Sequence, residues 1–384
     1  MLPTTATAAD APDKRNNDQE IPLTLENNNE VSPFETASCP VPLKHNEKIV
    51  MGHGSGGKMT QDLIKNIFMP HLDSEPLSAA NDFAQVSLPE GSHLNGYLSI
   101  STDSHAVAPL FFPGGDIGSL SVCGTVNDMS MAGATPLYLT AAFILEEGFD
   151  MDELEKIVLS MQRSAEEAGV QIVAGDTKVV ERGNADGVFI NTTGVGWVPT
   201  EHRIGGEQAR PGDVVLVSGN LGDHGIAVLG ARGDLGFETD IQSDIAPLNH
   251  MIQAVIKAAP HTHVLRDPTR GGLATTLNEI AVQSHTCIRL DENSLPVKPA
   301  VRAACEMLGF DPLYVANEGK LIAIVPSNEA EAALAAMKNS KYGENAAIIG
   351  VVKEEPIDRV LLNTIIGGTR LLDVMAGEML PRIC

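Results

Sequence analysis

The chain has 384 residues, of which 43% are hydrophobic and 20% are charged, a composition typical of a globular protein with two or three domains. Its formal net charge of -24 opposes binding to nucleic-acid backbones and to anionic membrane surfaces, so neither function is expected. An anionic small molecule can still bind where Lys, Arg, helix N-termini or a metal gather positive charge.

The first 45 residues form a polar stretch that contains Pro and Asn and has no hydrophobic periodicity. Such a stretch cannot bury enough apolar surface to offset the entropy of ordering, so we predict a disordered extension over residues 1–45. No apolar leader opens the chain, and no run of 18 apolar residues follows.

Residues 46–203 alternate between strand-like and helix-like segments and are predicted to form a first domain. Apolar residues repeat with helical spacing over 151–168, which predicts an amphipathic helix there. Strands are predicted at 96–104, 137–147, 170–180 and 188–198. A Pro-Gly turn followed by a new buried strand places the domain boundary near residues 200–204.

Residues 204–360 are predicted to form a second domain of the same α+β type. Helices are expected at 247–260, 272–284 and 328–340, and strands at 319–326 and 346–355. "GGLATTLNEIA" weakly resembles "GSLSVCGTVNDMSMAGA" of the first half, which fits two related domains and fits coincidence as well. Residues 361–384 are predicted to be a flexible tail.

The cysteines are five, an odd number with no C-x-x-C pair, which indicates neither a zinc site nor a disulfide framework. Free thiols in a cytoplasmic protein are the expectation. Three of the cysteines, Cys123, Cys287 and Cys305, are interpreted as core residues. Cys384 is different because it is the last residue, where a side chain is little packed.

A glycine-rich stretch, "HGSGGKMTQDLIKNIF", carries Gly54, Gly56 and Gly57 ahead of Lys58 and a predicted helix. Backbone N–H groups of such a loop can bind phosphate, with Lys58 adding charge. It is not a Walker A loop, because Met59 stands where Ser or Thr is required. A flexible turn is the alternative.

Acidic residues recur beside predicted strands: Asp82, Asp103 and Asp176, with Asp128 following Asn127 on a predicted helix. Any one of them could be a turn former or a helix cap. Together, carboxylates at neighbouring strand ends repel one another unless a cation lies between them, and Mg2+ prefers such ligands together with phosphates. The set favours a Mg-nucleotide site.

Three further motifs are candidates of unequal strength. "RDPTRGGL" places Arg266 and Arg270 around a Gly-Gly helix start, which suits an anion and also suits a structural loop. "ANEGK" would bring Glu318 into a cleft. "GDHG", with Asp223 and His224, is interpreted as a turn.

Taken together, these motifs resemble the HypE family of hydrogenase-maturation carbamoyl dehydratases. The quoted segments that carry the resemblance are "HGSGGK", "STDS", "FFPGGDIG", "GTVNDMSMAGA", "FILEEG", "GDTKVV", "GDHG", "RDPTRGG", "PVKPAVR", "ANEGK" and the terminal "PRIC". The wider superfamily contains aminoimidazole ribonucleotide (AIR) synthetase and selenophosphate synthetase. The match runs from about Ile49 to the end, so the long N-terminal extension departs from the family.

The resemblance implies a two-domain AIR-synthetase-like α+β fold. The N-terminal ATP-binding domain forms a barrel-like homodimer interface, and a C-terminal α/β domain precedes the flexible tail. It also implies that a HypF-type carbamoyltransferase loads a carbamoyl group onto Cys384. ATP then drives dehydration of this S-carboxamide to S-cyanate, and the cyanide passes to iron on a HypC–HypD complex for [NiFe] hydrogenase.

The resemblance further assigns residues to roles. Lys178 and Glu318 fall on positions that act near the thiocarboxamide. The implied ligands of the nucleotide-bound Mg2+ are Asp82, Asp103, Asp128 and Asp176. ATP binding falls to Gly54, Gly56, Gly57, Lys58, Asn127, Thr177 and Arg270.

The implied chemistry agrees with the residue types. Hydroxide is a poor leaving group, and phosphorylation of the carbonyl oxygen by ATP replaces it with phosphate. Glu318 is the expected base for the N–H proton. Sixteen residues follow Gly368, enough to reach about 50 Å when extended at ~3.3 Å per residue. Two alternatives stay open: a sibling ATP enzyme that needs no terminal cysteine, and a non-catalytic carrier of the modified thiol.

Overall fold

The structure, a computed structural model, describes residues 53, 57–72, 81–87, 95–200, 202–233, 240–375 and 382–384. The predicted extension, 1–45, lies outside these residues. Within them, no helix combines the length and the hydropathy needed to cross a membrane.

The first domain is built on a five-stranded sheet in the order β1-β2-β7-β5-β6, in which the β5–β6 pair is parallel and the others are antiparallel. The predicted strands are confirmed within a few residues. The bounds are β1 Ala84–Ser87, β2 Gly96–His105, β5 Thr135–Glu146, β6 Gln171–Val180 and β7 Val188–Pro199. A short hairpin of β3 (Phe111–Phe112) and β4 (Gly115–Asp116) precedes the first long helix.

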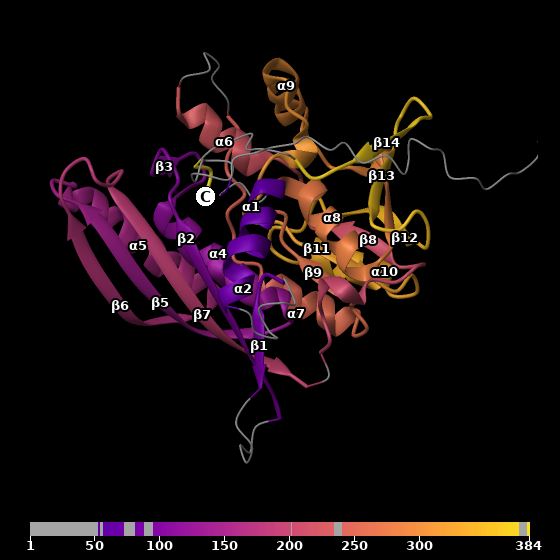
Figure 1. The fold of residues 1–384 in the computed structure, drawn as a ribbon, viewed down its shortest axis with the longest axis horizontal. Coiled ribbons are helices and arrows are strands. Elements are labelled where there is room, and N and C mark those ends of the chain that lie inside the picture. Colours follow the sequence, from indigo (N-terminus) through magenta and orange to yellow (C-terminus); the bar gives the residue numbers. More distant parts are fainter. Residues whose placement is uncertain are drawn as a thin grey trace, which may run out of the picture.

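Two helices pack on one side of this sheet, behind the strands in Figure 1. Helix α4 (Ile117–Met131) begins with a capping box, in which the Asp116 carboxylate accepts from the Gly118 and Ser119 amides. Helix α5 (Met151–Ala168) confirms the predicted amphipathic helix and ends at Gly169 in the left-handed conformation. The opposite side of the sheet has no helix of this chain on it (Figure 1) among the residues described.

The N-terminal stretch before the sheet is a helix in three parts, α1 (Lys58–Leu63), a π-helical turn (Ile64–Phe68) and α2 (Met69–Leu72). In Figure 1 it lies across the junction of the two halves of the molecule.

The second domain contains a seven-stranded mixed sheet in the order β14-β13-β10-β12-β8-β11-β9. Its strands are β8 Val214–Val217, β9 Val264–Arg266, β10 Cys287–Asp291, β11 Ile322–Val325, β12 Ala347–Lys353, β13 Arg359–Asn363 and β14 Thr369–Leu372. Its helices are α6 Asp223–Ala231, α7 Asn249–Ala258, α8 Gly272–Ser284, α9 Pro299–Leu308 and α10 Ala330–Lys338. The three predicted helices correspond to α7, α8 and α10.

The two domains share a core. One buried apolar cluster contains residues of α4 and α5 together with residues of α6 and α9. Asn249 and Gln253 of α7 also donate to backbone carbonyls of the first domain. Because both apolar packing and hydrogen bonds cross the boundary, the domains hold a fixed relative position.

The end of the chain differs from its predicted form. Residues 361–372, predicted as part of the tail, complete β13 and form β14, which pair in register inside the sheet. The segment beyond the sheet therefore begins after Leu372. The C-terminus lies back against the junction of the two domains, near β3 and α6 (Figure 1).

Candidate active site

Four carboxylates meet where the two domains join. Asp103 lies near the end of β2, Asp128 on α4, Asp82 just before β1, and Asp267 directly after β9. Asp128 accepts a hydrogen bond from Ser101 of β2 at 2.7 Å, which joins the helix to the strand. Here "acid cluster" denotes these four residues.

Burial and the charges of neighbouring carboxylates raise the pKa values of Asp82, Asp128 and Asp267. Burial raises the pKa of Asp128 well above its usual range, and the charges of Asp267, Asp103 and Asp82 raise it further. Burial, with the charge of Asp82, raises the pKa of Asp267 to about 8. A cation among these groups would remove this cost, as would protonation.

Asp82, a predicted metal ligand, and Arg266, a predicted anion-binding residue, form an ion pair with each other. The Nε atom of Arg266 lies 2.5 Å from Asp82 Oδ2, and its guanidinium also donates to Glu279 Oε2 at 2.7 Å. Burial raises the pKa of Asp82 to about 6 in spite of this cation. Arg266 is thus held by two carboxylates, which leaves Arg270 as the arginine of "RDPTRGG" that can serve an anion.

Glu318 lies beside the acid cluster on the loop before β11. Its backbone N–H donates to Asp244 Oδ1 at 3.0 Å, and Lys320 pairs with the same carboxylate at 2.9 Å. The Glu318 side chain is 4% exposed, and its Oε1 atom has no hydrogen-bond partner. Burial and the charges of three aspartates raise its pKa well above the usual range, while the Arg270 guanidinium lowers it.

Asn127 has a structural task in this site. Its amide donates to the carbonyl oxygens of Ala246 and Glu318, and its Oδ1 accepts from the Leu248 N–H at 2.8 Å. The side chain is fully buried. The structure therefore places this predicted ATP-binding residue as a link that fixes the Glu318 loop against α4.

Cys384 lies against this site from the other side. An oxygen of its terminal carboxylate accepts from the Ala106 N–H, one residue after β2, at 3.1 Å. The negative charge at Cys384 is the largest influence on Arg270, whose pKa is raised. Asp103 and Glu318 act on the same guanidinium, so the terminal residue and Glu318 both lie within electrostatic range of Arg270.

Asp176, Thr177 and Lys178 are not part of this assembly in one chain. They lie on β6, three strands away from β2 in the sheet, about 14 Å at ~4.8 Å per strand. Register pairs Asp103 with Thr192 and Asp176 with Ala142, so the two aspartates point to opposite faces. Asp176 and Lys178 pair with each other at 3.7 Å and are 69% and 73% exposed.

The glycine-rich loop is described in part. Gly57 precedes α1, and the N–H of exposed Lys58 donates to the carbonyl oxygen of Met375 at 3.1 Å. Gly54 and Gly56 lie outside the described residues.

The donor set of the acid cluster suits a hydrated cation better than a closed protein cage. Among the described residues, no three His, Cys, Asp or Glu side chains converge tightly enough to bind a metal by themselves. Mg2+ is usually held by one or two carboxylates, waters and substrate phosphates, a requirement that these aspartates can meet.

Sequence reasoning missed Asp267 as a member of the acid cluster. The residue lies inside "RDPTRGG", a motif that was selected for its two arginines. Its position directly after a buried strand is the same signal that selected Asp103, and it could have been used.

The sequence matches known protein families over both domains. Residues 82–198 match the family model "AIR synthase related protein, N-terminal domain", and residues 210–363 match "AIR synthase related protein, C-terminal domain". The chain is 54% identical to the carbamoyl dehydratase HypE of Cupriavidus necator over 337 residues, which are 88% of this chain and 95% of that protein.

Solved structures give the same result. A structure described as a HypE–HypF complex superposes with a TM-score of 0.76 at 50% identity, covering 82% of this chain and 99% of the other. A structure of the hydrogenase maturation protein HypE in complex with ATP has a TM-score of 0.73 at 50% identity, covering 88% and 100%.

Proposed function

The chain belongs to the HypE family of carbamoyl dehydratases, enzymes that dehydrate a carbamoyl group, and we propose that its substrate is an S-carbamoyl group on its own Cys384. The observation that supports this most is the position of the last residue. The charge of Cys384 acts on Arg270, as does that of Glu318, although the chain leaves the sheet at Leu372.

The proposed reaction has two steps, phosphorylation of the carbamoyl group and loss of phosphate. The carbonyl oxygen of Cys–S–C(=O)–NH2 takes the γ-phosphoryl group of ATP, and ADP leaves. The N–H protons are then removed as the C–O bond breaks, giving Cys–S–C≡N and phosphate. The carbamoyl oxygen thus departs as part of phosphate, which is a better leaving group than hydroxide.

Glu318 is the proposed proton acceptor. A carboxyl group with a raised pKa holds its proton more firmly than an exposed one, so it suits general acid–base work near neutral pH once cations stabilise its ionised form. Arg270 supplies one such cation and can stabilise the transferred phosphoryl group.

ATP binding by this chain is proposed from the ATP complex of its relative and from the acid cluster. Asp103, Asp128 and Asp267 would hold Mg2+, which when bound neutralises phosphate charge. The roles expected for Gly57, Lys58 and Thr177 in nucleotide binding stay proposals.

We also propose a homodimer through the first-domain sheet, with the barrel-like interface that the family resemblance implies. Strand β6 is exposed along almost all of its length, and Ile172, Val173 and Val179 are 40%, 56% and 67% exposed. An exposed apolar edge strand is normally covered by a partner. Lys178 lies on this strand, so its proposed role at the thiocarboxamide requires the active site of the partner subunit.

Partners follow from the same proposal. A HypF-type carbamoyltransferase would load Cys384, in line with the HypE–HypF complex of a relative, and a HypC–HypD complex would accept the cyanide. A reducing compartment, the cytoplasm, would keep the thiol free for this exchange. The segment after Leu372 must then leave its docked position to reach these partners.

The deciding experiment replaces Cys384 with Ser. Full-length protein is incubated with a HypF-type transferase, carbamoyl phosphate and ATP, and the C-terminal peptide is analysed by mass spectrometry. We expect carbamoylated and then dehydrated Cys384 in the wild type and in a Cys39→Ser control, and no modification in Cys384→Ser. ATP turnover with an unmodified terminal peptide would favour a sibling ATP enzyme, and modification without ATP turnover would favour a carrier.

A further inference from the structure

The last three residues of the chain occupy a docking site formed by both domains. Just after β2, the Ala106 N–H donates to a terminal carboxylate oxygen of Cys384 at 3.1 Å, and the Ala108 N–H donates to the Arg382 carbonyl oxygen at 3.2 Å. These two bonds have the spacing of a short antiparallel pairing. The terminus is thus added as an extended segment to the first domain.

The second domain completes the site through α6. Arg232, at the C-terminal end of this helix, donates from Nε to the Ala108 carbonyl oxygen and from a terminal nitrogen to the Arg382 carbonyl oxygen, both at 2.9 Å. The Nε2 atom of buried His224, in the first turn of α6, lies 2.8 Å from the Ile383 carbonyl oxygen. One arginine and one histidine therefore bind the main chain of the terminus.

The tautomer of His224 follows from its two partners. A carbonyl oxygen can only accept, so Nε2 carries the hydrogen. Burial lowers the pKa of His224, which favours the neutral ring, and the Nδ1 atom is then an acceptor. Ser243 Oγ lies 2.8 Å from Nδ1 and already accepts from the Ile245 N–H, so the hydroxyl donates to the ring.

The β3–β4 hairpin supports this histidine. The Ser243 N–H donates to the Pro113 carbonyl oxygen at 2.8 Å, and the ring of Phe112 meets that of His224 edge-on, with centroids 5.6 Å apart. The motifs "FFPGGDIG" and "GDHG", for which the proposed chemistry has no role, thus lie in one structure behind the terminus.

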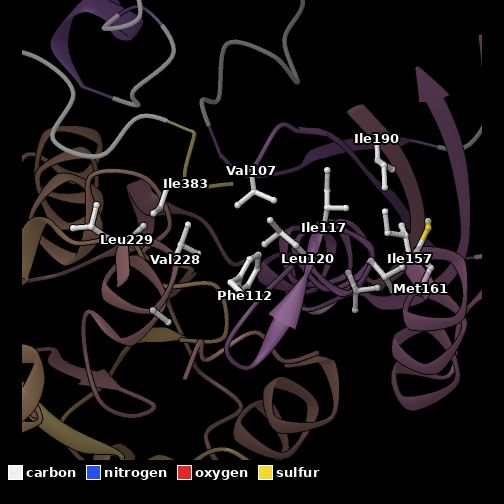
Figure 2. Packing of buried hydrophobic residues seen from close by; sticks show 14 of the residues in the cluster. Val107, Phe112, Ile117, Leu120, Ile157, Met161, Ile190, Val228, Leu229 and Ile383 are labelled. Carbon is white, nitrogen blue, oxygen red and sulfur yellow. The ribbon is translucent and has the colours of Figure 1, made fainter. Parts of the chain in front are cut away.

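Side chains of the terminus add an anchor and a rim contact. Ile383 is 4% exposed, and Figure 2 shows it among Val107, Val228 and Leu229. Arg382 pairs with Asp186 at 2.7 Å at the edge of the site, where Asp186 is 58% exposed.

We propose that His224, oriented by Ser243, is a positioning residue that holds the terminus in the active site. The inference rests on the proposed function, because it takes Cys384 as the carrier of the reacting group. These contacts are made to main-chain oxygens and to the side chains of Ile383 and Arg382, so they do not depend on whether the sulfur carries a hydrogen, a carbamoyl group or a cyano group.

The test compares two replacements of His224 in the full-length protein. His224→Gln keeps an N–H donor for the Ile383 carbonyl and an acceptor for Ser243, whereas His224→Leu fills similar space without a donor. Carboxypeptidase Y is added without ATP, and loss of the terminal residues is followed by intact mass. Cleavage needs an undocked end, so its rate reports the undocked fraction.

We expect trimming about fivefold faster in His224→Leu and within about twofold of wild type in His224→Gln, as loss of one hydrogen bond predicts. Ile383→Ser, at the chain end, should also speed trimming. If His224→Leu does not fold, Ser243→Ala replaces it. A wild-type rate in the folded Leu or Ala variant, or an equal increase in Gln and Leu, overturns the proposal. Such a result leaves the proposed chemistry intact, because the assay needs no carbamoyl group or nucleotide.

Discussion

Two groups of charged residues, the acid cluster and the pair Asp176–Lys178, have opposite surroundings. The acid cluster lies at the domain junction, where burial and the charges of neighbouring carboxylates raise the pKa values of Asp128 and Asp267. Asp176 and Lys178 are exposed on β6 and balance each other. Residue type therefore identifies both groups as candidate active-site residues. Only their places in the fold show that the acid cluster is assembled within one chain.

The largest effect is expected from a change to Glu318, which lies buried beside the acid cluster. Glu318→Gln keeps the shape of the side chain and removes the base, so dehydration of carbamoylated Cys384 should slow by about 10²-fold or more, with loading unchanged. Mass spectrometry of the C-terminal peptide over time measures both steps. Glu306→Gln on the exposed face of α9 is the matched control. Normal dehydration in Glu318→Gln would withdraw the assigned role.

The exposed side can be tested by mixing subunits. Lys178→Met should be folded like the wild type yet slow in dehydration by about 10-fold or more if the side chain acts in catalysis. If Lys178 serves the partner's site, dimers mixed from Lys178→Met and Glu318→Gln subunits contain one intact site and should regain about a quarter of wild-type activity. If Lys178 acts within its own chain, each mixed dimer has two damaged sites and no activity returns.

A smaller effect concerns stability against pH. The folded pKa of Asp267, about 8, lies above the reference value of 3.8, so this group stabilises the folded protein at low pH, and that contribution is lost as pH rises between these values. Asp267→Asn should therefore raise the stability of nucleotide-free protein at pH 8 by on the order of 2–3 kcal/mol and flatten its dependence on pH.

Thermal unfolding between pH 5 and about pH 8 measures this difference. Asp176→Asn, on exposed β6, should change the curve by less than about 0.5 kcal/mol. An unchanged pH dependence in Asp267→Asn would mean that its carboxyl is ionised in the folded protein and already paired.

The long helices and strands were predictable because the hydrophobic residues of each repeat with one clear period. The helix at 151–168 buries one face and ends at a glycine, and both signals are local. Strand β14 was missed because four residues between turns carry no period, and its pairing with β13 is decided by the rest of the sheet.

The site was predictable to the level of its motifs and no further. The motifs predicted Glu318 and Cys384 as members of one site, and in the structure the charges of both residues act on Arg270. Which face of β6 carries Lys178 depends on strand register across β7 and β5, which no local pattern encodes. His224 was interpreted as a turn residue because its partner, Ile383, is 159 positions away.

The hairpin of β13 and β14 shortens the reach of the terminus. Twelve residues, 373–384, follow Leu372, so Cys384 can travel at most about 40 Å from the sheet at ~3.3 Å per residue. A sulfur on so short a tether is present near its own pocket at an effective concentration in the millimolar range. Weak docking contacts are then sufficient to return Cys384 to the pocket. A partner protein can displace the docked residues at little energetic cost.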